Sequence, residues 1–208
     1  MSIRAALFDF GGVVTTSPFE AFTRYEHGRG LPADFIRGLN ATNPDDNAWA
    51  HLERNHIDID VFCDRYEAEA RTAGHEIDAR EVLACLSGDF RPAVIEAIKR
   101  CRAKITTGCI TNNIAPMTEG EGWAGPAKLD ELFDVVIESS KVGVRKPDPR
   151  IYELACEAMG VEPTEVVFLD DLGINLKPAA AMGMTTIKVV DPDVALAELE
   201  AAVGFPLG

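Results

Sequence analysis

The fold of this chain is set near its start by Ala5–Val14, AALFDFGGVV, an apolar run that carries one carboxylate, Asp9, and then two adjacent glycines. Short apolar runs that stop at turn residues are typical of strands inside a parallel sheet. Such sheets place their chemistry just beyond the carboxyl ends of the strands. The stretch therefore predicts a buried strand that delivers Asp9 to that edge. Taken alone, it is equally compatible with a strand and a Gly-Gly turn in which Asp9 is only a capping residue.

Strand and helix patterns alternate in the second half of the chain. Apolar runs predict strands at Lys104–Ile110, Phe133–Glu138, Glu165–Leu169 and Thr185–Val190. Helical periodicity predicts helices at Arg91–Arg102, Pro149–Met159 and Leu176–Met182. Alternating segments of these lengths, joined by right-handed crossovers, favour an α/β fold with a doubly wound parallel sheet covered by helices on both faces. Met117–Lys128, with three glycines, is the expected mobile loop.

The region between the first strand and this alternating part reads as a small helical module. Helical spacing of apolar residues predicts helices near Phe19–Tyr25, Leu31–Leu39, Ala48–Leu52 and Ile59–Ala73. We therefore expect an α/β core domain of residues 1–15 and 89–208, with a helical domain of residues 16–88 inserted directly after the first strand. An insertion at this point could cover the carboxyl edge of the sheet.

The composition favours a globular protein that acts on a small molecule. The chain has 208 residues, 47% of them hydrophobic, which is enough for one substantial core and a small second module. A net charge of −14 disfavours nonspecific binding of nucleic acid or anionic lipid. No apolar segment approaches the roughly 20 residues of a membrane span, and the start lacks a signal-peptide pattern, so we expect a cytoplasmic protein. We expect it to be a monomer or a homodimer. The five cysteines lack Cys-x-x-Cys spacing, which predicts core thiols rather than a zinc site.

Two polar stretches follow predicted strands and could join Asp9. Thr111-Asn112-Asn113 offers a hydroxyl, an amide and backbone N–H groups that suit phosphate oxygens, although an ordinary loop with a cap is the simpler alternative. Lys146 precedes a proline and is therefore held extended, at the start of a helix that Asp148 and Pro149 would begin. Solvated surface is the alternative for a single lysine at that position.

Asp170-Asp171 ends the strand predicted at Glu165–Leu169. Adjacent carboxylates repel one another unless a cation or other hydrogen-bond donors hold them. This pair is the strongest single indication of a metal site in the sequence.

Together, these four stretches resemble the haloacid dehalogenase (HAD) superfamily, and in particular the N-terminal phosphatase domain of soluble epoxide hydrolases and its bacterial relatives. The likeness is strongest in Val135–Tyr152, which contains KPDPRIY, and in Glu165–Val190, which contains FLDDLGINLKP. It implies a HAD-like Rossmannoid core with a helical cap domain that closes over the site and selects substrates. It also implies a hydrolase, specifically a Mg²⁺-dependent phosphatase of small phosphorylated metabolites.

The resemblance implies a nucleophile and a set of metal ligands. Asp9 would attack phosphorus to give an aspartyl-phosphate that water then hydrolyses. Mg²⁺ would be held by an Asp9 oxygen, the backbone carbonyl of Gly11 and Asp171, with Asp170 binding it directly or through water.

It also implies residues that bind the substrate. Thr111 and Asn112 would bind the phosphoryl oxygens, and Lys146 would neutralise charge on the nucleophile and the phosphoryl group. Asn175 is either a partner of the metal ligands or the N-cap of a helix.

One position departs from the family pattern. The usual first motif is Asp-x-Asp, and its second carboxylate protonates the leaving group, but here that position is Gly11. The backbone carbonyl that binds metal survives this change, whereas the general acid does not. Substitute acids could be Thr15, Thr16, Glu20, His51 or His56, each of which also has a structural explanation.

Two other functions stay open. A carbon–halogen hydrolase would also lack the second Asp, but it has no need of a metal site, so the Asp170-Asp171 pair argues against it. A binding or regulatory protein with decayed catalysis would explain the loss of one acid at Gly11. The substrate itself is not indicated, and residues that could line its pocket, or belong to the cap core or surface, are Phe19, Arg24, Trp49 and Arg54.

Overall fold

The computed structural model describes residues 2–114 and 129–207, so the loop predicted at Met117–Lys128 lies outside the described residues. Five parallel strands form one sheet in the order β3-β2-β1-β4-β5. They are β1 (Ala5–Phe8), β2 (Thr106–Thr111), β3 (Val135–Glu138), β4 (Val166–Asp170) and β5 (Thr185–Lys188). The strand order reverses between β1 and β4, and ligands of open α/β sheets bind at such a switch point. The predicted doubly wound α/β fold is confirmed.

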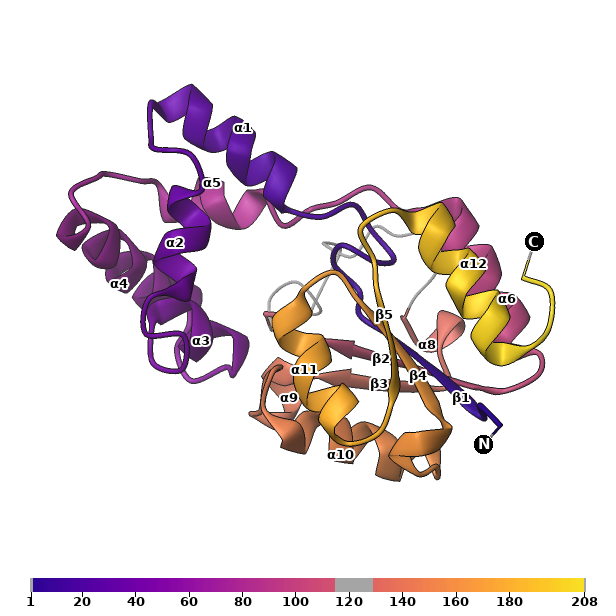
Figure 1. Cartoon of the computed structure of the whole chain (residues 1–208). Coiled ribbons are helices and arrows are strands. Elements are labelled where there is room, and N and C mark those ends of the chain that lie inside the picture. The colour runs from indigo at the N-terminus through magenta and orange to yellow at the C-terminus, as the bar shows by residue number, and fades with distance from the viewer. Residues whose placement is uncertain (1, 115–128, 208) are drawn as a thin grey trace.

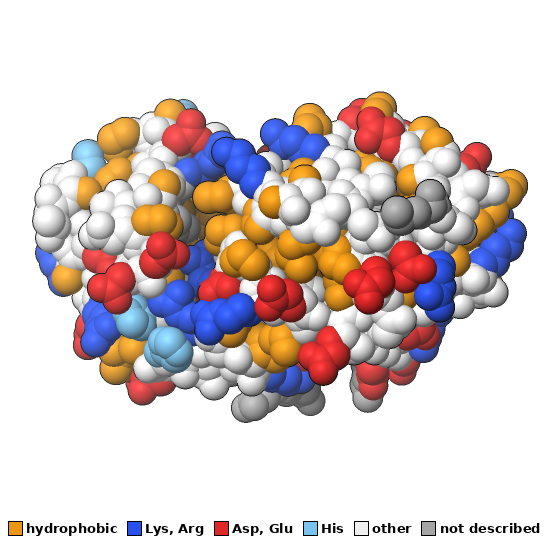
Figure 2. Space-filling view, turned by 60° about the horizontal axis from the view of Figure 1, so that its bottom comes forward, with side chains coloured by type: hydrophobic (Ala, Val, Ile, Leu, Met, Phe, Trp, Pro, Cys, Tyr) orange, Lys and Arg blue, Asp and Glu red, His pale blue; other side chains and the backbone are white. Residues whose placement is uncertain are grey.

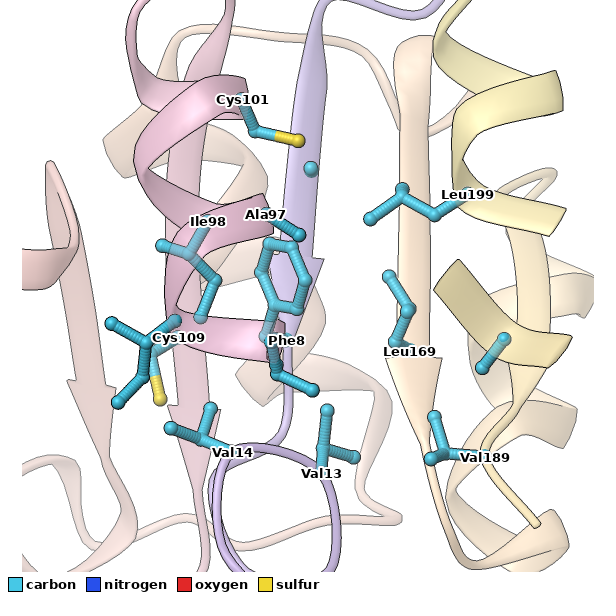
Figure 3. Close-up of a cluster of buried hydrophobic side chains, with 14 of the residues drawn as sticks. Phe8, Val13, Val14, Ala97, Ile98, Cys101, Cys109, Leu169, Val189 and Leu199 are labelled. Atoms are coloured by element: carbon cyan, nitrogen blue, oxygen red, sulfur yellow. The ribbon is translucent and has the colours of Figure 1, made fainter. Parts of the chain in front are cut away.

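Helices cover both faces of the sheet (Figure 1). Side chains of β1 alternate, so that Ala6 and Phe8 pack on one face and Ala5 and Leu7 on the other. The first face is covered by α6 (Pro92–Arg102), α8 (Leu129–Leu132) and α12 (Pro192–Val203), and Figure 3 shows its apolar layer. The second face is covered by α10 (Pro149–Met159) and α11 (Gly173–Ala181), with the short α9 (Ser139–Val142) directly after β3 and a 3₁₀ turn at Pro163–Glu165.

Several boundaries differ from those expected. The helix predicted at Leu31–Leu39 spans Phe35–Ala41, and β2 and β3 each begin two residues after their predicted starts. Helix α11 begins at Gly173, three residues before the predicted start, and β5 ends at Lys188, two residues before the predicted end. None of the helices within the described residues combines the length and the hydropathy that crossing a membrane requires.

The helical lobe lies beside the sheet and has its own apolar core (Figure 1). Trp49 is at its centre, with ring-centroid distances of 6.2 Å to Phe22, 5.6 Å to Phe62 and 5.5 Å to Tyr66. Ile114, which follows β2, packs into the same cluster. The lobe consists of α1 (Phe19–Arg29), α2 (Phe35–Ala41), α3 (Ala48–Glu53), α4 (Ile59–Thr72) and α5 (Ala79–Ala84).

Two neighbouring segments connect the helical lobe to the sheet. Thr15 and Phe90 form an isolated antiparallel bridge, and the N–H of Thr16 donates to the carbonyl of Asp89 at 2.8 Å. The N–H of Arg91 donates to the carbonyl of Val14 at 2.9 Å. The domain boundaries expected at 15/16 and 88/89 fall in this connection, and the division into two domains stays a prediction.

A buried carboxylate caps α2 from a distance. Glu26, only 2% exposed, accepts hydrogen bonds from the N–H groups of Asp34 at 3.0 Å and Ile36 at 2.8 Å. Asp34 precedes α2 but makes no capping hydrogen bond with its own side chain. Glu26 therefore supplies the acceptor that an N-cap side chain ordinarily supplies.

Replacing Glu26 by Ala should lower the free energy of unfolding by about 1 to 3 kcal/mol, because the backbone N–H of Ile36 loses its buried acceptor. Urea unfolding of wild type and variant would measure the loss. Glu76→Ala, which removes an exposed carboxylate of the same region, is the control and should change stability by less than about 0.5 kcal/mol. Equal losses in the two variants would contradict the capping role.

Candidate active site

Asp9 stands directly after β1 at the carboxyl edge of the sheet. Its N–H donates to the carbonyl of Leu169 at 2.8 Å, which extends the β1–β4 pairing to this residue. Its Oδ1 accepts a hydrogen bond from the N–H of Phe10 at 2.6 Å and lies 2.7 Å from Lys146 Nζ. Burial raises the pKa of Asp9 well above its ordinary value, although Lys146 opposes the rise. The strand thus delivers a buried carboxylate to the edge, as the sequence predicts.

Lys146 is a buried ammonium, 1% exposed, that contacts two carboxylates. Its Nζ lies 2.7 Å from Asp9 Oδ1 and 2.7 Å from Asp170 Oδ2. Burial acts to lower the pKa of Lys146, but Asp170 and Asp9 outweigh it and raise the pKa above its ordinary value. The side chain is therefore cationic, and the surface alternative considered for this lysine is wrong.

The Asn112 side chain holds the backbone of Lys146. Its Oδ1 accepts from the N–H of Lys146 at 2.8 Å, and its Nδ2 donates to the carbonyl of Lys146 at 3.0 Å. A cis peptide bond follows, between Lys146 and Pro147. These two bonds use the oxygen and one of the two N–H groups of the carboxamide, so a contact between Asn112 and a phosphoryl group could use the second N–H or the backbone.

Asp170 is fully buried and its two carboxylate oxygens are engaged by hydrogen-bond donors. Oδ1 accepts from the N–H of Leu172 at 2.8 Å and from Asn175 Nδ2 at 3.0 Å, and Oδ2 lies 3.1 Å from the same Nδ2. Asn175 is the third residue of α11, whose N-cap is Leu172, so the N-cap alternative for Asn175 is wrong. Asn175 instead orients the carboxylate of Asp170.

Asp171 has fewer hydrogen-bond donors around it than Asp170 and lies beside the loop that follows Asp9. Ser17 Oγ donates to Asp171 Oδ2 at 3.1 Å. Gly12 has a φ of 82°, and a Cβ there would lie 2.2 Å from Asp171 Oδ2, so glycine is required by both backbone and space. Burial, and then the neighbouring charge of Asp170, raise the pKa of Asp171 to about 6.

The three carboxylates fit a hard divalent cation. Oxygen atoms of Asp9, Asp170 and Asp171 lie within 4.8 Å of one another. Only one ammonium, Lys146, contacts this cluster within the described residues, and the pKa values of Asp9 and Asp171 are raised first by burial and then by the neighbouring carboxylates. Oxygen donors are the ligands that Mg²⁺ prefers. Asp171 is the carboxylate least engaged by protein donors and is therefore the best placed to bind the ion directly.

The raised pKa of Asp171 predicts how metal-free stability depends on pH. Because the pKa is higher in the folded protein than the ordinary 3.8, the folded state holds the proton more tightly and stability falls as pH rises from about 4 to about 6. Asp171→Asn should remove the part of this fall that Asp171 causes, while the part that comes from the raised pKa of Asp9 remains. It should raise the free energy of unfolding by about 1 to 3 kcal/mol at pH 7.5, with little effect at pH 4.

Urea unfolding in EDTA across this pH range would measure the difference. Asp64→Asn, on the exposed side of α4, is the matched control and should leave the pH profile unchanged. A profile for Asp171→Asn that runs parallel to that of wild type would contradict the assigned cause.

Two further predicted residues lie at the same edge. Thr111 ends β2 and is 7% exposed, and its hydroxyl makes no hydrogen bond to another described residue, so it is available to a ligand. Gly11 lies in the loop after Asp9, and a Cβ on it would meet no heavy atom within 4 Å.

Three of the five side chains considered as substitute acids are engaged elsewhere. Thr15 Oγ1 donates to the carbonyl of Thr16, and Thr16 Oγ1 accepts from the N–H of Asp89 at 3.0 Å. His51 Nε2 lies 2.8 Å from Asp46 Oδ1 in the helical lobe. Trp49, considered for the substrate pocket, belongs to the core of the lobe.

Sequence reasoning missed Ser17 at this site. A serine before Pro18 gives no chemical signal of its own, and its contact with Asp171 joins positions 154 residues apart. Only the placement of the segment that leads into α1 brings the two together.

Comparison with known proteins shows the family of this chain. The sequence profile of haloacid dehalogenase-like hydrolases matches residues 3–183. The chain belongs to this family. Its resemblance to the superfamily is thereby confirmed, and the chain is a HAD-like hydrolase.

Relatives of this HAD-like hydrolase include phosphatases. It is 33% identical over 196 residues to phosphatase MT3486 of Mycobacterium tuberculosis, covering 88% of this chain and 86% of that protein. It is 33% identical over 225 residues to mouse bifunctional epoxide hydrolase 2, covering 99% of this chain and 40% of that protein. A HAD family enzyme of Bacteroides thetaiotaomicron, crystallised with magnesium and inorganic phosphate, has the same fold, with a TM-score of 0.63, 20% identity and coverage of 90% and 94% of the two chains.

The chain spans 20% to 40% of the length of the mammalian relatives that it matches along nearly all of its own sequence. The similarity to those longer proteins therefore does not show that this chain has their activities.

Proposed function

We propose that this HAD-like hydrolase is a Mg²⁺-dependent phosphatase of small phosphorylated metabolites and that it works through an aspartyl-phosphate on Asp9. The observation that carries the proposal is the buried Lys146 ammonium between Asp9 and Asp170, with the carboxylate of Asp171 beside them. Phosphoryl transfer requires alignment and compensation of negative charge more than covalent chemistry. Similarity to phosphatase MT3486 supports this reading.

The residues of the chain would divide the reaction as follows. A carboxylate oxygen of Asp9 attacks phosphorus, and its bond to phosphorus forms as the bond to the leaving oxygen breaks. Lys146, already 2.7 Å from Asp9, neutralises charge on the nucleophile and on the phosphoryl oxygens. The Thr111 hydroxyl donates to a phosphoryl oxygen. Water then hydrolyses the aspartyl-phosphate and returns the Asp9 carboxylate.

Asp9, Asp171 and the backbone carbonyl of Gly11 would hold the Mg²⁺ ion, with Asp170 contacting it through water because its oxygens are already engaged by Lys146 and Asn175. When bound, the ion compensates the negative charge of the phosphoryl group.

The carboxylates of the site distinguish a Mg²⁺-dependent phosphatase from a carbon–halogen hydrolase. A dehalogenase needs no metal, whereas this site holds a third carboxylate, Asp171, whose oxygen lies within 4.8 Å of those of Asp9 and Asp170 and whose pKa is raised to about 6 by burial and by Asp170. The helical lobe would act as the cap that closes over the sheet edge and selects the substrate.

A panel of phosphate monoesters and 2-haloacids, assayed with Mg²⁺ and with EDTA, tests the proposal. We expect hydrolysis of phosphates that is lost in EDTA and restored by excess Mg²⁺. Haloacid turnover that EDTA leaves unchanged would instead identify a dehalogenase. Turnover of neither class, in a protein that still binds inorganic phosphate, would identify a binding protein.

A further inference from the structure

The helical lobe contacts the sheet domain at α3, away from the segments that connect the two covalently (Figure 1). Ser139 Oγ, in α9, donates to the carbonyl of Glu53 at 2.7 Å. Arg145 reaches from the sheet domain into the lobe, where its Nη1 donates to the carbonyl of Pro44 at 2.8 Å and its Nε lies 2.6 Å from Glu53 Oε2. Figure 2 shows a hollowed seam between the two halves, with hydrophobic side chains inside it and Lys and Arg side chains at its borders.

The Arg145–Glu53 pair is held firmly on the side of the lobe. The two side chains are only 20% and 10% exposed. The other carboxylate oxygen of Glu53 accepts from Trp49 Nε1 at 2.9 Å, and Trp49 is packed at the centre of the lobe. A movement of α3 would therefore move the carboxylate that Arg145 contacts.

The pair is equally well connected on the side of the sheet. Arg145 directly precedes Lys146, whose ammonium contacts Asp9 and whose backbone is held by Asn112. Asn113, the next residue, donates from its N–H to the same Ser139 Oγ at 3.0 Å. The lobe is thus linked through two short paths to the residues that place the ammonium.

We expect the net contribution of this pair to the stability of the whole fold to be small. Arg145 Nε and Glu53 Oε2 are close, but neither atom makes a hydrogen bond of good geometry to any described residue. The cost of desolvating two charges offsets most of the attraction in such buried pairs. A contact with small net stability, placed next to Lys146, is better explained by the position that it imposes.

We propose that Arg145 and Glu53 form a latch that keeps the helical lobe closed over the sheet edge and, through that closure, fixes Lys146 against Asp9. Both are positioning residues, because neither contacts the reacting atoms. Opening the lobe about its two connecting segments would have to separate this pair. The effect on rate rests on the proposed phosphatase function, whereas the effect on closure does not.

Hydrogen exchange measured by mass spectrometry tests closure without any substrate. The variants are Arg145→Met, Glu53→Gln and the double variant, with Arg150→Met as control, because Arg150 is 69% exposed and pairs with Asp148 in its own segment. We expect amides of residues 44–56 to exchange about 5- to 100-fold faster than wild type in both single variants. The double variant should exchange at the same rate as the single variants, because the pair is already broken in each of them. Amides of α6 and those of the control should match wild type.

Wild-type exchange at residues 44–56 in both single variants would overturn the latch. Faster exchange that includes α6 would also overturn it, because the pair would then support the whole fold. Glu53→Gln keeps an acceptor for Trp49, so it separates loss of the latch from loss of packing in the lobe.

Hydrolysis of p-nitrophenyl phosphate with Mg²⁺ tests the effect on the site. A displaced Lys146 should lower kcat by about 10- to 100-fold in each single variant, with a smaller change in KM and no further loss in the double variant. Losses that multiply in the double variant would show two independent roles and overturn the proposal. If wild type itself fails to hydrolyse phosphate esters, the proposed function fails, and the exchange experiment still decides the latch.

Discussion

Replacing Asp9 by Asn should lower kcat on phosphate monoesters by more than about 10⁴-fold, because an amide cannot attack phosphorus. The fold should persist, since an amide oxygen can still accept from the N–H of Phe10 and contact Lys146 as Asp9 Oδ1 does now. Removal of a residue that merely positions substrate costs far less. Steady-state kinetics and far-UV circular dichroism would separate the two effects.

Asp191→Asn is the matched control for this substitution. Asp191 caps α12, accepting from the N–H groups of Asp193 and Val194, and Asn caps helices equally well. The control should therefore keep wild-type turnover. An Asp9→Asn variant that kept more than a few per cent of wild-type kcat would remove Asp9 from the role of nucleophile, and the aspartyl-phosphate mechanism with it.

The parts of the site that could be predicted are those that lie at strand ends. Asp9, Thr111 and Asp170 each follow a local apolar run, and parallel strands bring their carboxyl ends to one edge regardless of the rest of the fold. The role of Lys146 is harder to predict from sequence, because a lysine before a proline is ordinarily a solvated surface residue. Its burial depends on Asp170 and Asn112, which are 24 and 34 residues away.

The contacts that could not be predicted join separate elements, either between the helical lobe and the sheet or within the lobe. Glu53 lies in a short helix with no distinctive motif, and nothing local indicates that it meets Arg145. Glu26 looks like a solvated residue of α1, yet it is buried and caps α2. Periodicity specifies which side of a helix is apolar, but not which neighbour a polar side chain on it meets.

At Gly11 this chain departs from the family pattern, and the structure permits an aspartate there. The backbone of Gly11 is outside the left-handed region that Gly12 occupies, and a Cβ at Gly11 would meet no heavy atom within 4 Å. The metal would be bound at this position by a backbone carbonyl, which the substitution retains. A new carboxylate could therefore be added without displacing Asp9 or Asp171.

Gly11→Asp should raise kcat by about 10²- to 10⁴-fold for phosphate monoesters with poor, alkoxide-like leaving groups, because a positioned acid protonates the leaving oxygen as charge develops on it. The gain should be small for aryl and acyl phosphates, whose leaving groups depart without protonation. Rates of wild type, Gly11→Asp and Gly11→Asn across a leaving-group series would measure the dependence, since Asn has the same shape and no acidic proton. Gly28→Asp adds the same charge at an open glycine in α1 and should leave every rate unchanged. A gain that is uniform across the series, or one that Gly11→Asn reproduces, would show that residue 11 does not supply the missing acid and would direct the search to the helical lobe.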